Sequence, residues 1–266
     1  MLKYTDMQPA PGEAALSIGQ TDRIPDEVIK RLLSASNVAV LTGAGVSAES
    51  GVPTFRGEDG LWKNYRAEEL ATPGAFQQDP DLVWEWYHWR RGIVSQASPN
   101  AAHQALVRIE EMAPAFLLIT QNVDGLHLEA GSKEVLEIHG NLRRARCSDC
   151  GDTVQLTDEE GLIDCGECGS DMRPDVVWFG ENLDPVILER SFAAATNADF
   201  FLVAGTSSVV QPAASLAWTA GQNNGFVLEV NLDPTPLTGQ ADATLLGKAG
   251  DILSKLVEDV WGSEQL

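Results

Sequence analysis

The sequence predicts an α/β fold, in which a Rossmann-like parallel sheet covered by helices carries a smaller inserted module. Apolar runs of strand length alternate for the most part with helical segments, which suits a parallel sheet buried on both faces. Each run is followed at once by a glycine or a polar residue, as at the carboxyl edge of an open α/β sheet, where ligands bind. Two stretches fall outside this alternation and predict the inserted module.

The elements follow in chain order. Residues 1–21 contain prolines and glycines without steady periodicity, and we expect a flexible tail there. Apolar residues from Ile24 to Leu33 recur at helical spacing, with Pro25 near the first turn. Strands are expected at residues 37–42, 115–120, 200–204 and 226–230.

The domain limits follow from the same pattern. The Rossmann-like domain is expected to take residues 22–57, 101–140 and 173–266. The smaller module takes residues 58–100, which are rich in Trp, Tyr and charge and look helical. It also takes residues 141–172, where the cysteines stand among turn residues.

Composition restricts the partners. The 39 acidic against 18 basic residues give a formal charge of −21, which disfavours direct nucleic-acid binding because phosphate contacts depend on Lys and Arg. A cationic protein segment is a more natural client. No apolar run reaches the roughly 18 residues of a membrane helix, and the N-terminus lacks the pattern of a signal peptide. We expect a cytoplasmic, monomeric protein without a membrane partner.

A glycine loop follows the first strand. Gly43-x-Gly45-x-x-Ala48 is the pattern by which a backbone turns tightly and offers its N–H groups to a pyrophosphate. A glycine-rich turn without a ligand is the alternative. Phe55 and Arg56 add an aromatic surface and a guanidinium that can contact a dinucleotide. No acidic residue stands where a dehydrogenase holds the adenosine ribose, which argues against hydride transfer.

Polar residues also follow the second strand. Gln121, Asn122 and Asp124 can converge on a ribose or an amide, although an Asx-type turn closed by Gly125 is the structural alternative. His139 follows an apolar alternating run and is a candidate general base, since imidazole titrates near neutral pH. A structural histidine is its alternative.

All four cysteines fall in one ribbon-like pattern. Cys147-x2-Cys150 and Cys165-x2-Cys168 have the spacing of a tetrahedral site with four thiolates and no open position. In a cytosolic enzyme this pattern indicates one structural zinc rather than disulfides. We expect the zinc to hold the small module together and to perform no chemistry.

Two segments can bind a peptide by strand addition. Residues 175–181 and 205–212 both look extended, and a pair of exposed edges accepts an added strand. Both can also be plain structure.

The four signals in this order resemble the sirtuin family of NAD-dependent protein lysine deacylases, from about residue 25 to 262. The resemblance implies that the glycine loop through Arg56 and the polar cluster hold NAD, that Asn122 and Asp124 act around the nicotinamide ribose, and that His139 is the base. Its NAD-binding residues carry over onto Gly43, Ala44, Gly45, Phe55, Arg56, Gln121, Asn122, Asp124, Gly205, Thr206, Ser207, Asn231 and Ala249. Within the first of the two extended segments, the candidate substrate-binding residues are Val176, Val177, Trp178, Phe179 and Gly180.

A finer resemblance concerns the acyl group. Tyr87-x-x-Arg90, preceded by Ala67, is similar to the sirtuin subgroup that removes malonyl and succinyl groups. A small Ala67 leaves room in the acyl pocket, while Arg90 and the Tyr87 hydroxyl can grip a distal carboxylate by a charge-assisted pairing. The alternative is an aromatic helix face with solvated arginines, because Tyr and Arg three apart share one face.

The resemblance therefore implies a deacylase acting on acylated lysines of proteins, a desuccinylase and demalonylase that also deacetylates. Its products would be nicotinamide, free lysine and O-acyl-ADP-ribose. Three alternatives stay open: a primary deacetylase, a protein ADP-ribosyltransferase, and a non-enzymatic zinc module.

Overall fold

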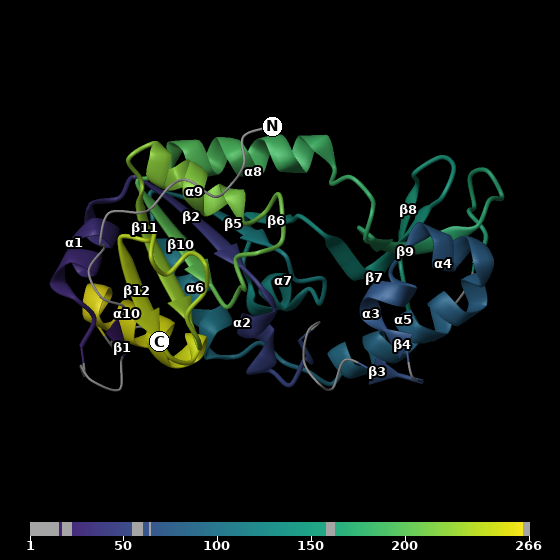
Figure 1. Cartoon of the computed structure of the whole chain (residues 1–266), viewed down its shortest axis with the longest axis horizontal. Helices are drawn as coiled ribbons and strands as arrows, with labels where there is room; N and C mark the ends of the chain where they lie inside the picture. Colours follow the sequence, from purple (N-terminus) through teal and green to yellow (C-terminus); the bar gives the residue numbers. More distant parts are fainter. Residues whose placement is uncertain (1–15, 18–22, 55–60, 64, 158–162, 263–266) are drawn as a thin grey trace.

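A computed structural model covers the chain and describes residues 16–17, 23–54, 61–63, 65–157 and 163–262 (Figure 1). Within these residues, seven strands form one parallel sheet in the order β1-β12-β11-β10-β2-β5-β6. They are β1 (Leu16–Ser17), β2 (Asn37–Thr42), β5 (Ala115–Thr120), β6 (Val135–Glu137), β10 (Phe200–Ala204), β11 (Phe226–Asn231) and β12 (Ala243–Leu246). The predicted fold class is confirmed.

Helices cover both faces of this sheet (Figure 1). One face packs against α1 (Asp26–Ser34), α2 (Ala44–Ala48), α6 (Ala101–Met112) and α10 (Ala249–Trp261), and the other against α8 (Pro185–Asn197) and α9 (Ser215–Gln222). Along β10, Phe200 and Leu202 enter the first core while Phe201 and Val203 enter the second. Side chains alternate along a strand, so burial on both faces explains the uninterrupted apolar run.

Most of the predicted tail lies outside the described residues. Within it, Leu16 and Ser17 form β1 and pair in parallel with Leu245 and Leu246 of β12. The tail is therefore tied to the sheet at this point. In the described part of the chain, no helix is long and apolar enough to cross a membrane.

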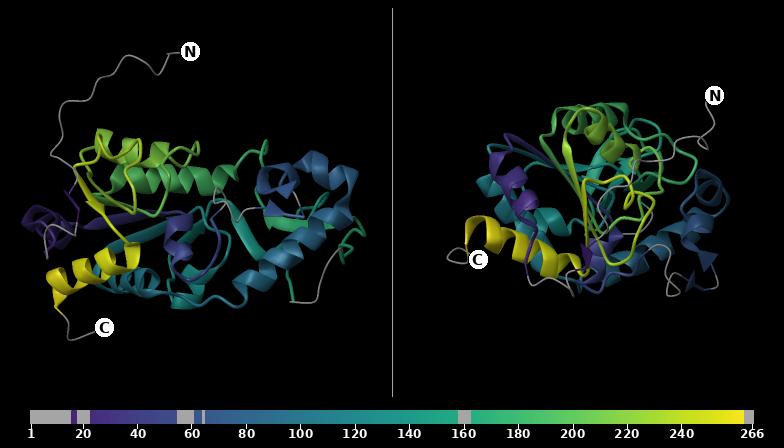
Figure 2. Two further views of the ribbon diagram at one scale, coloured as in Figure 1. Left: turned by 60° about the horizontal axis from the view of Figure 1, so that its bottom comes forward. Right: turned by 60° about the vertical axis from the view of Figure 1, so that its left-hand side comes forward.

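The smaller module lies beyond one end of the sheet domain, as the left view of Figure 2 shows. Its helical part contains the hairpin β3 (Leu61–Trp62) and β4 (Tyr65–Arg66), followed by α3 (Ala67–Leu70), α4 (Pro73–Gln78) and α5 (Pro80–Val94). Its second part is an antiparallel sheet in the order β8-β7-β9, with β7 (Gly140–Cys147), β8 (Thr153–Gln155) and β9 (Met172–Val176). Strand β9 continues to Val176. The antiparallel sheet therefore includes residues 173–176, which the sequence pattern assigns to the Rossmann-like domain.

Candidate active site

The glycine loop after β2 is packed backbone to backbone against the loop after β10. The N–H of Gly43 donates to the carbonyl of Ala204 at 3.1 Å, and that of Gly45 donates to the carbonyl of Gly205 at 2.7 Å. A Cβ on Gly45 would lie 2.8 Å from the Cα of Gly205, which itself has φ +60°. Only glycine allows this approach, so the motif places Ala44 and the start of α2 at the carboxyl edge.

Asn122 joins the ends of β2 and β5. Its Nδ2 donates to the carbonyl of Gly43 and to the hydroxyl of Ser47, both at 3.0 Å, and the side chain is buried. Ser47 was not among the predicted site residues. Its position in the glycine loop, two residues after Gly45, was the available signal.

Gln121 after β5 and Asn231 at the end of β11 both bond to Thr206, which follows β10. Gln121 Nε2 donates to Thr206 Oγ1 at 2.8 Å, and Asn231 Nδ2 donates to the Thr206 carbonyl at 2.8 Å. Ser207 is exposed beside them, and the buried Ser208 Oγ has no hydrogen-bond partner among the described residues. The predicted residues at four strand ends are thus brought together, with hydroxyl and amide groups suited to a nucleotide.

Asp124 forms the Asx-type turn that the sequence left open as an alternative. Its Oδ1 accepts from the N–H of Leu126 at 2.9 Å, and Gly125 has φ +78°. The same carboxylate is only 4 % exposed. It lines a small cavity together with Ala44, Asn122 and Arg90, so the turn presents it to the site.

His139 has a defined tautomer. Its Nδ1 lies 3.1 Å from the carbonyl of Gln121, and because a carbonyl only accepts, Nδ1 must carry the proton. In neutral imidazole the Nε2 lone pair then remains for another proton. Burial lowers the pKa of His139, against a smaller opposing effect of the Gln121 hydrogen bond. The neutral form with a basic Nε2 is therefore favoured.

Two further histidines lie inside the sheet domain. His127 Nε2 is 2.9 Å from Thr42 Oγ1, and His103 Nδ1 accepts from the N–H of Asn100 at 3.2 Å. Their ring centroids are 4.7 Å apart and both are buried. Burial lowers the pKa of His103 and takes that of His127 to about 3. Both are held neutral as internal supports.

The residues predicted for the acyl group are all buried in the small module. Ala67, Tyr87 and Trp178 share one apolar cluster. The Trp178 Nε1–H donates to the Tyr87 hydroxyl oxygen at 2.9 Å, which leaves the Tyr87 O–H to act as a donor. Arg90 lies 5.5 Å from the Trp86 ring and, as a lining residue of the small cavity, adjoins Asp124. Burial raises the pKa of Tyr87 and lowers that of Arg90.

The predicted substrate segment follows β9, which ends at Val176. The Val177 N–H donates to the His139 carbonyl at 2.9 Å, which joins the segment to the candidate base. Trp178 is buried, whereas Phe179 is half-exposed and Gly180 stands at φ +89° in a turn. The second predicted extended stretch is wrong: residues 205–212 are all described, and none lies in a strand.

The four cysteines form one cluster. All four Sγ atoms lie within 4.8 Å of one another, and the Cys147–Cys168 and Cys150–Cys165 pairs are 3.4 and 3.6 Å apart. Tetrahedral zinc with Zn–S bonds of about 2.3 Å needs sulfur atoms about 3.8 Å apart. The cysteines therefore fit the predicted zinc.

The remaining predicted cofactor residues are Phe55, Arg56 and Ala249. Phe55 and Arg56 lie outside the described residues. Ala249 is buried at the start of α10, where the N–H of Gly250 donates to Glu49 Oε1 at 3.1 Å. Since Glu49 follows α2, this contact ties α10 to the glycine loop.

The fold and this site together define an α/β dinucleotide-binding enzyme with a four-cysteine metal module. The sequence profile of the Sir2 family matches residues 43–212. NAD-dependent protein deacylase 1 of Archaeoglobus fulgidus is 50 % identical over 238 residues, which cover 88 % of this chain and 97 % of that protein. The chain therefore belongs to the Sir2 family, the sirtuins, and is an NAD-dependent protein deacylase.

Solved structures agree. A Sir2 homologue in complex with NAD superposes with a TM-score of 0.86 at 47 % identity, covering 94 % of this chain and 96 % of that one. A mutant Sir2 homologue bound to 2′-O-acetyl ADP ribose gives a TM-score of 0.85 at 48 % identity, covering 91 % and 99 %. The predicted cosubstrate, NAD, agrees with the NAD complex of the homologue, and the predicted zinc agrees with the four-cysteine cluster.

Proposed function

We propose that this deacylase prefers acidic acyl groups, succinyl and malonyl, on protein lysines, and that it also removes acetyl groups. The relative bound to 2′-O-acetyl ADP ribose supports the acetyl activity. The preference rests on Tyr87 and Arg90, which both come from α5 of the module. Arg90 also lines the small cavity with Asn122 and Asp124 of the sheet edge.

The NAD-binding roles follow from the sheet edge. We assign Gly43 to Gly45, Gln121 and Asn231 to holding NAD, because their loops meet where the strands end. Asn122 and Asp124 are nearly covered, at 6 % and 4 % exposure, and would orient the nicotinamide ribose away from bulk water. When bound, NAD supplies the ribose carbon that nicotinamide leaves and the hydroxyl that takes up the acyl group. Exclusion of water protects that carbon from hydrolysis.

His139 is the proposed general base. Its Nδ1–H is committed to the Gln121 carbonyl, so Nε2 is the atom that accepts a proton from a ribose hydroxyl. The lowered pKa keeps this nitrogen unprotonated at neutral pH. The Val177 N–H on the His139 carbonyl ties the base to the segment that would align the client peptide.

One observation carries the acyl preference. The Trp178 indole occupies an acceptor site of the Tyr87 hydroxyl, and Arg90 stands one helical turn further along the same face of α5. A hydroxyl donor and a guanidinium are thereby fixed in one buried region beside the small Ala67. A carboxylate at the end of an acyl chain would receive two charge-assisted hydrogen bonds there, which an acetyl group cannot make.

The test compares one peptide that carries succinyl-lysine with the same peptide carrying acetyl-lysine. Nicotinamide release and lysine deacylation are followed in both, and we expect a higher kcat/KM for the succinyl peptide. A preference for acetyl would discard the acidic pocket and leave a primary deacetylase. Nicotinamide release without deacylation would point to ADP-ribosyl transfer.

A further inference from the structure

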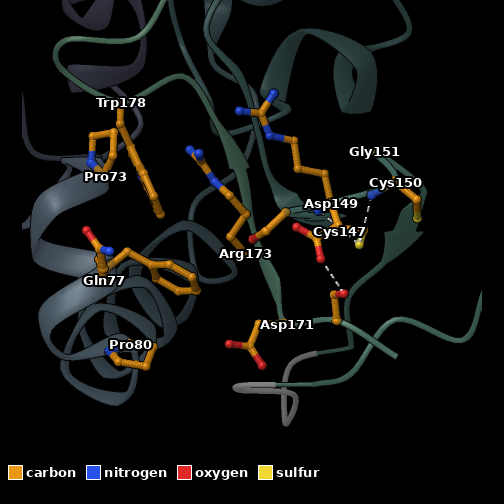
Figure 3. A pocket seen from close by; sticks show the side chains of 14 residues that line it. Pro73, Gln77, Pro80, Cys147, Asp149, Cys150, Gly151, Asp171, Arg173 and Trp178 are labelled. Atoms are coloured by element: carbon orange, nitrogen blue, oxygen red, sulfur yellow. Dashed lines mark hydrogen bonds between the residues drawn. The ribbon is translucent and has the colours of Figure 1, made fainter. Parts of the chain in front are cut away.

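A groove of about 850 Å³ lies between α4 and the part of the small module that carries the four cysteines, called the ribbon side below. It is lined by residues that the proposed function does not use, apart from Trp178. Figure 3 shows Pro73, Gln77 and Pro80 on one side and Asp149, Asp171 and Arg173 on the other. The two sides come from segments about 70 to 100 residues apart in the sequence.

The helix side of the groove is mainly apolar. Pro73, Phe76 and Pro80 line it, with the exposed Gln77 among them. The Phe76 ring lies 5.2 Å from the Trp178 ring, so Trp178 continues this wall into the groove. Aromatic and proline surfaces of this kind pack well against the aliphatic stem of a lysine or an arginine.

With Glu181 counted, the ribbon side carries three carboxylates against two guanidiniums. Its two arginines, Arg146 and Arg173, both pair with Glu181. Asp149 accepts a hydrogen bond from the hydroxyl of Ser170, but neither Asp149 nor Asp171 forms an ion pair with any residue that the structure describes. Four thiolates around a divalent zinc add further negative charge to the same wall.

Asp171 is exposed and points across the groove toward the side of Pro80 (Figure 3). A cation that lies along Phe76 would meet this carboxylate, and the ring face would contribute a cation–π contact. The groove thus offers both an apolar stem site and a carboxylate at its end.

Arg173 gives a second and independent indication of a ligand. Its side chain lines the groove, the residue is 7 % exposed, and the guanidinium stacks 3.3 Å from the Trp178 ring centroid. The buried Nε–H has no hydrogen-bond partner among the described residues. A buried donor without an acceptor costs about 1–3 kcal/mol. A main-chain carbonyl of a chain entering the groove would satisfy it.

We propose that this groove binds a basic segment of the client protein, with a lysine or arginine side chain between Phe76 and Asp171. This proposal rests on the proposed function, because it takes the client to be the protein whose acylated lysine the enzyme acts on. Trp178 belongs to the segment assigned to the client peptide and also forms a wall of the groove, so one client chain can occupy both. The formal charge of −21 favours the approach of such a segment.

The first experiment measures binding without catalysis. A short fluorescent lysine-rich peptide that carries no acyl group is titrated with the zinc-loaded protein, and anisotropy gives the Kd. Gln77→Lys places a positive charge on the helix wall, and we expect it to weaken binding about fivefold, as for one partly exposed charge. Gln78→Lys is the matched control, since Gln78 is its exposed neighbour and does not line the groove.

A second pair tests the opposite wall. Asp171→Lys should weaken binding more than Gln77→Lys does, because it also removes the carboxylate. Asp164→Lys is the control, since Asp164 is exposed and faces Asp171 across a β-bridge outside the groove. Equal losses in test and control variants would reduce the effect to general acidity and overturn the proposal. Equal binding of a serine-rich peptide would overturn it too.

Kinetics separate this proposal from the assigned activity. An acyl-lysine peptide with a lysine-rich extension should show a lower KM than the unextended peptide at equal kcat, and Gln77→Lys should abolish only that gain. If the unextended peptide is not turned over, the proposed function fails while the binding result stands. If the extension changes no KM and the labelled peptide does not bind, the groove is not a client site.

Discussion

The two halves of the catalytic region are built by different means. At the carboxyl edge of the large sheet, Gly43, Gln121 and Asn122 are positioned by hydrogen bonds of 2.8 to 3.1 Å that connect the ends of three consecutive strands, β10, β2 and β5. In the small module, Tyr87 and Trp178 are positioned by an aromatic core and by contacts between distant segments. The cysteine cluster is a further means of fixing the structure, and it is found in the module and not at the sheet edge.

This difference separates two properties of the enzyme. The sheet edge is supported by a core on each face of a parallel sheet and should keep its geometry without the module. The module has smaller cores, and we expect the cluster that includes Cys147 and Cys165 to depend on the zinc that the cysteines would bind. We therefore expect NAD chemistry to depend on the sheet edge, and the proposed client binding and acyl selectivity to depend on the module.

Loss of zinc should have the largest effect, because it should disrupt the module while the sheet domain stays folded. Cys168→Ser leaves three thiolates, and structural zinc contributes about 10–16 kcal/mol in isolated zinc-finger peptides. We expect deacylation to be lost and the module to become sensitive to protease, while circular dichroism retains the signal of the sheet domain. Ser148→Ala, an exposed neighbour of Cys147, is the control. A variant with parent-like zinc content and activity would show that Cys168 is not needed.

His139→Ala tests the sheet edge alone. We expect turnover to fall by about a hundredfold to ten-thousandfold, the usual contribution of a general base, at an unchanged melting temperature. His88→Ala, on the exposed face of α5, should leave the rate unchanged. Near-normal turnover of His139→Ala would remove this residue from the mechanism.

The pH dependence of kcat/KM gives a second test of His139. Burial disfavours the imidazolium form and lowers the pKa of His139 below its ordinary value of 6.5. The base form therefore persists into weakly acidic solution, and kcat/KM should fall on the acid side with an apparent pKa below 6.5. An acid limb above that value would contradict the assignment of His139 as a partly buried base.

The sequence could predict the sheet edge better than the module. The predicted strands at residues 37–42, 115–120 and 200–204 match β2, β5 and β10 to the residue, because burial on both faces leaves an uninterrupted apolar run. Parallel strands end at one edge, so Gln121 and Asn122 could be placed near Gly43 from the chain alone. The hydrogen bond between Tyr87 and Trp178 joins residues 91 apart and has no periodic signature. The charged groove is likewise formed by segments that lie far apart in the sequence, so no local pattern predicts it.

Arg90→Met tests the selectivity assigned to the module. The substitution keeps an unbranched apolar side chain of similar length and removes the charge. A hydrogen bond to a charged group contributes about 1.5–3 kcal/mol, so kcat/KM for the succinyl peptide should fall by about tenfold to a hundredfold. The acetyl peptide should change little. Arg91→Met is the matched control, since Arg91 is also buried but lies against Trp84 at 5.7 Å. Equal losses on both peptides would make Arg90 structural.

Trp178→Phe should have the smallest effect and the most specific one. Phenylalanine keeps a ring for Arg173 to stack on but lacks the indole N–H that holds the Tyr87 hydroxyl. One such bond contributes about 0.5–1.5 kcal/mol, so the ratio of succinyl to acetyl turnover should fall by about threefold to tenfold. Trp84→Phe removes a comparable buried bond, 3.2 Å to the Met172 carbonyl, and should lower stability without changing the ratio. If both variants shift the ratio alike, selectivity follows the packing of the module as a whole rather than the orientation of Tyr87.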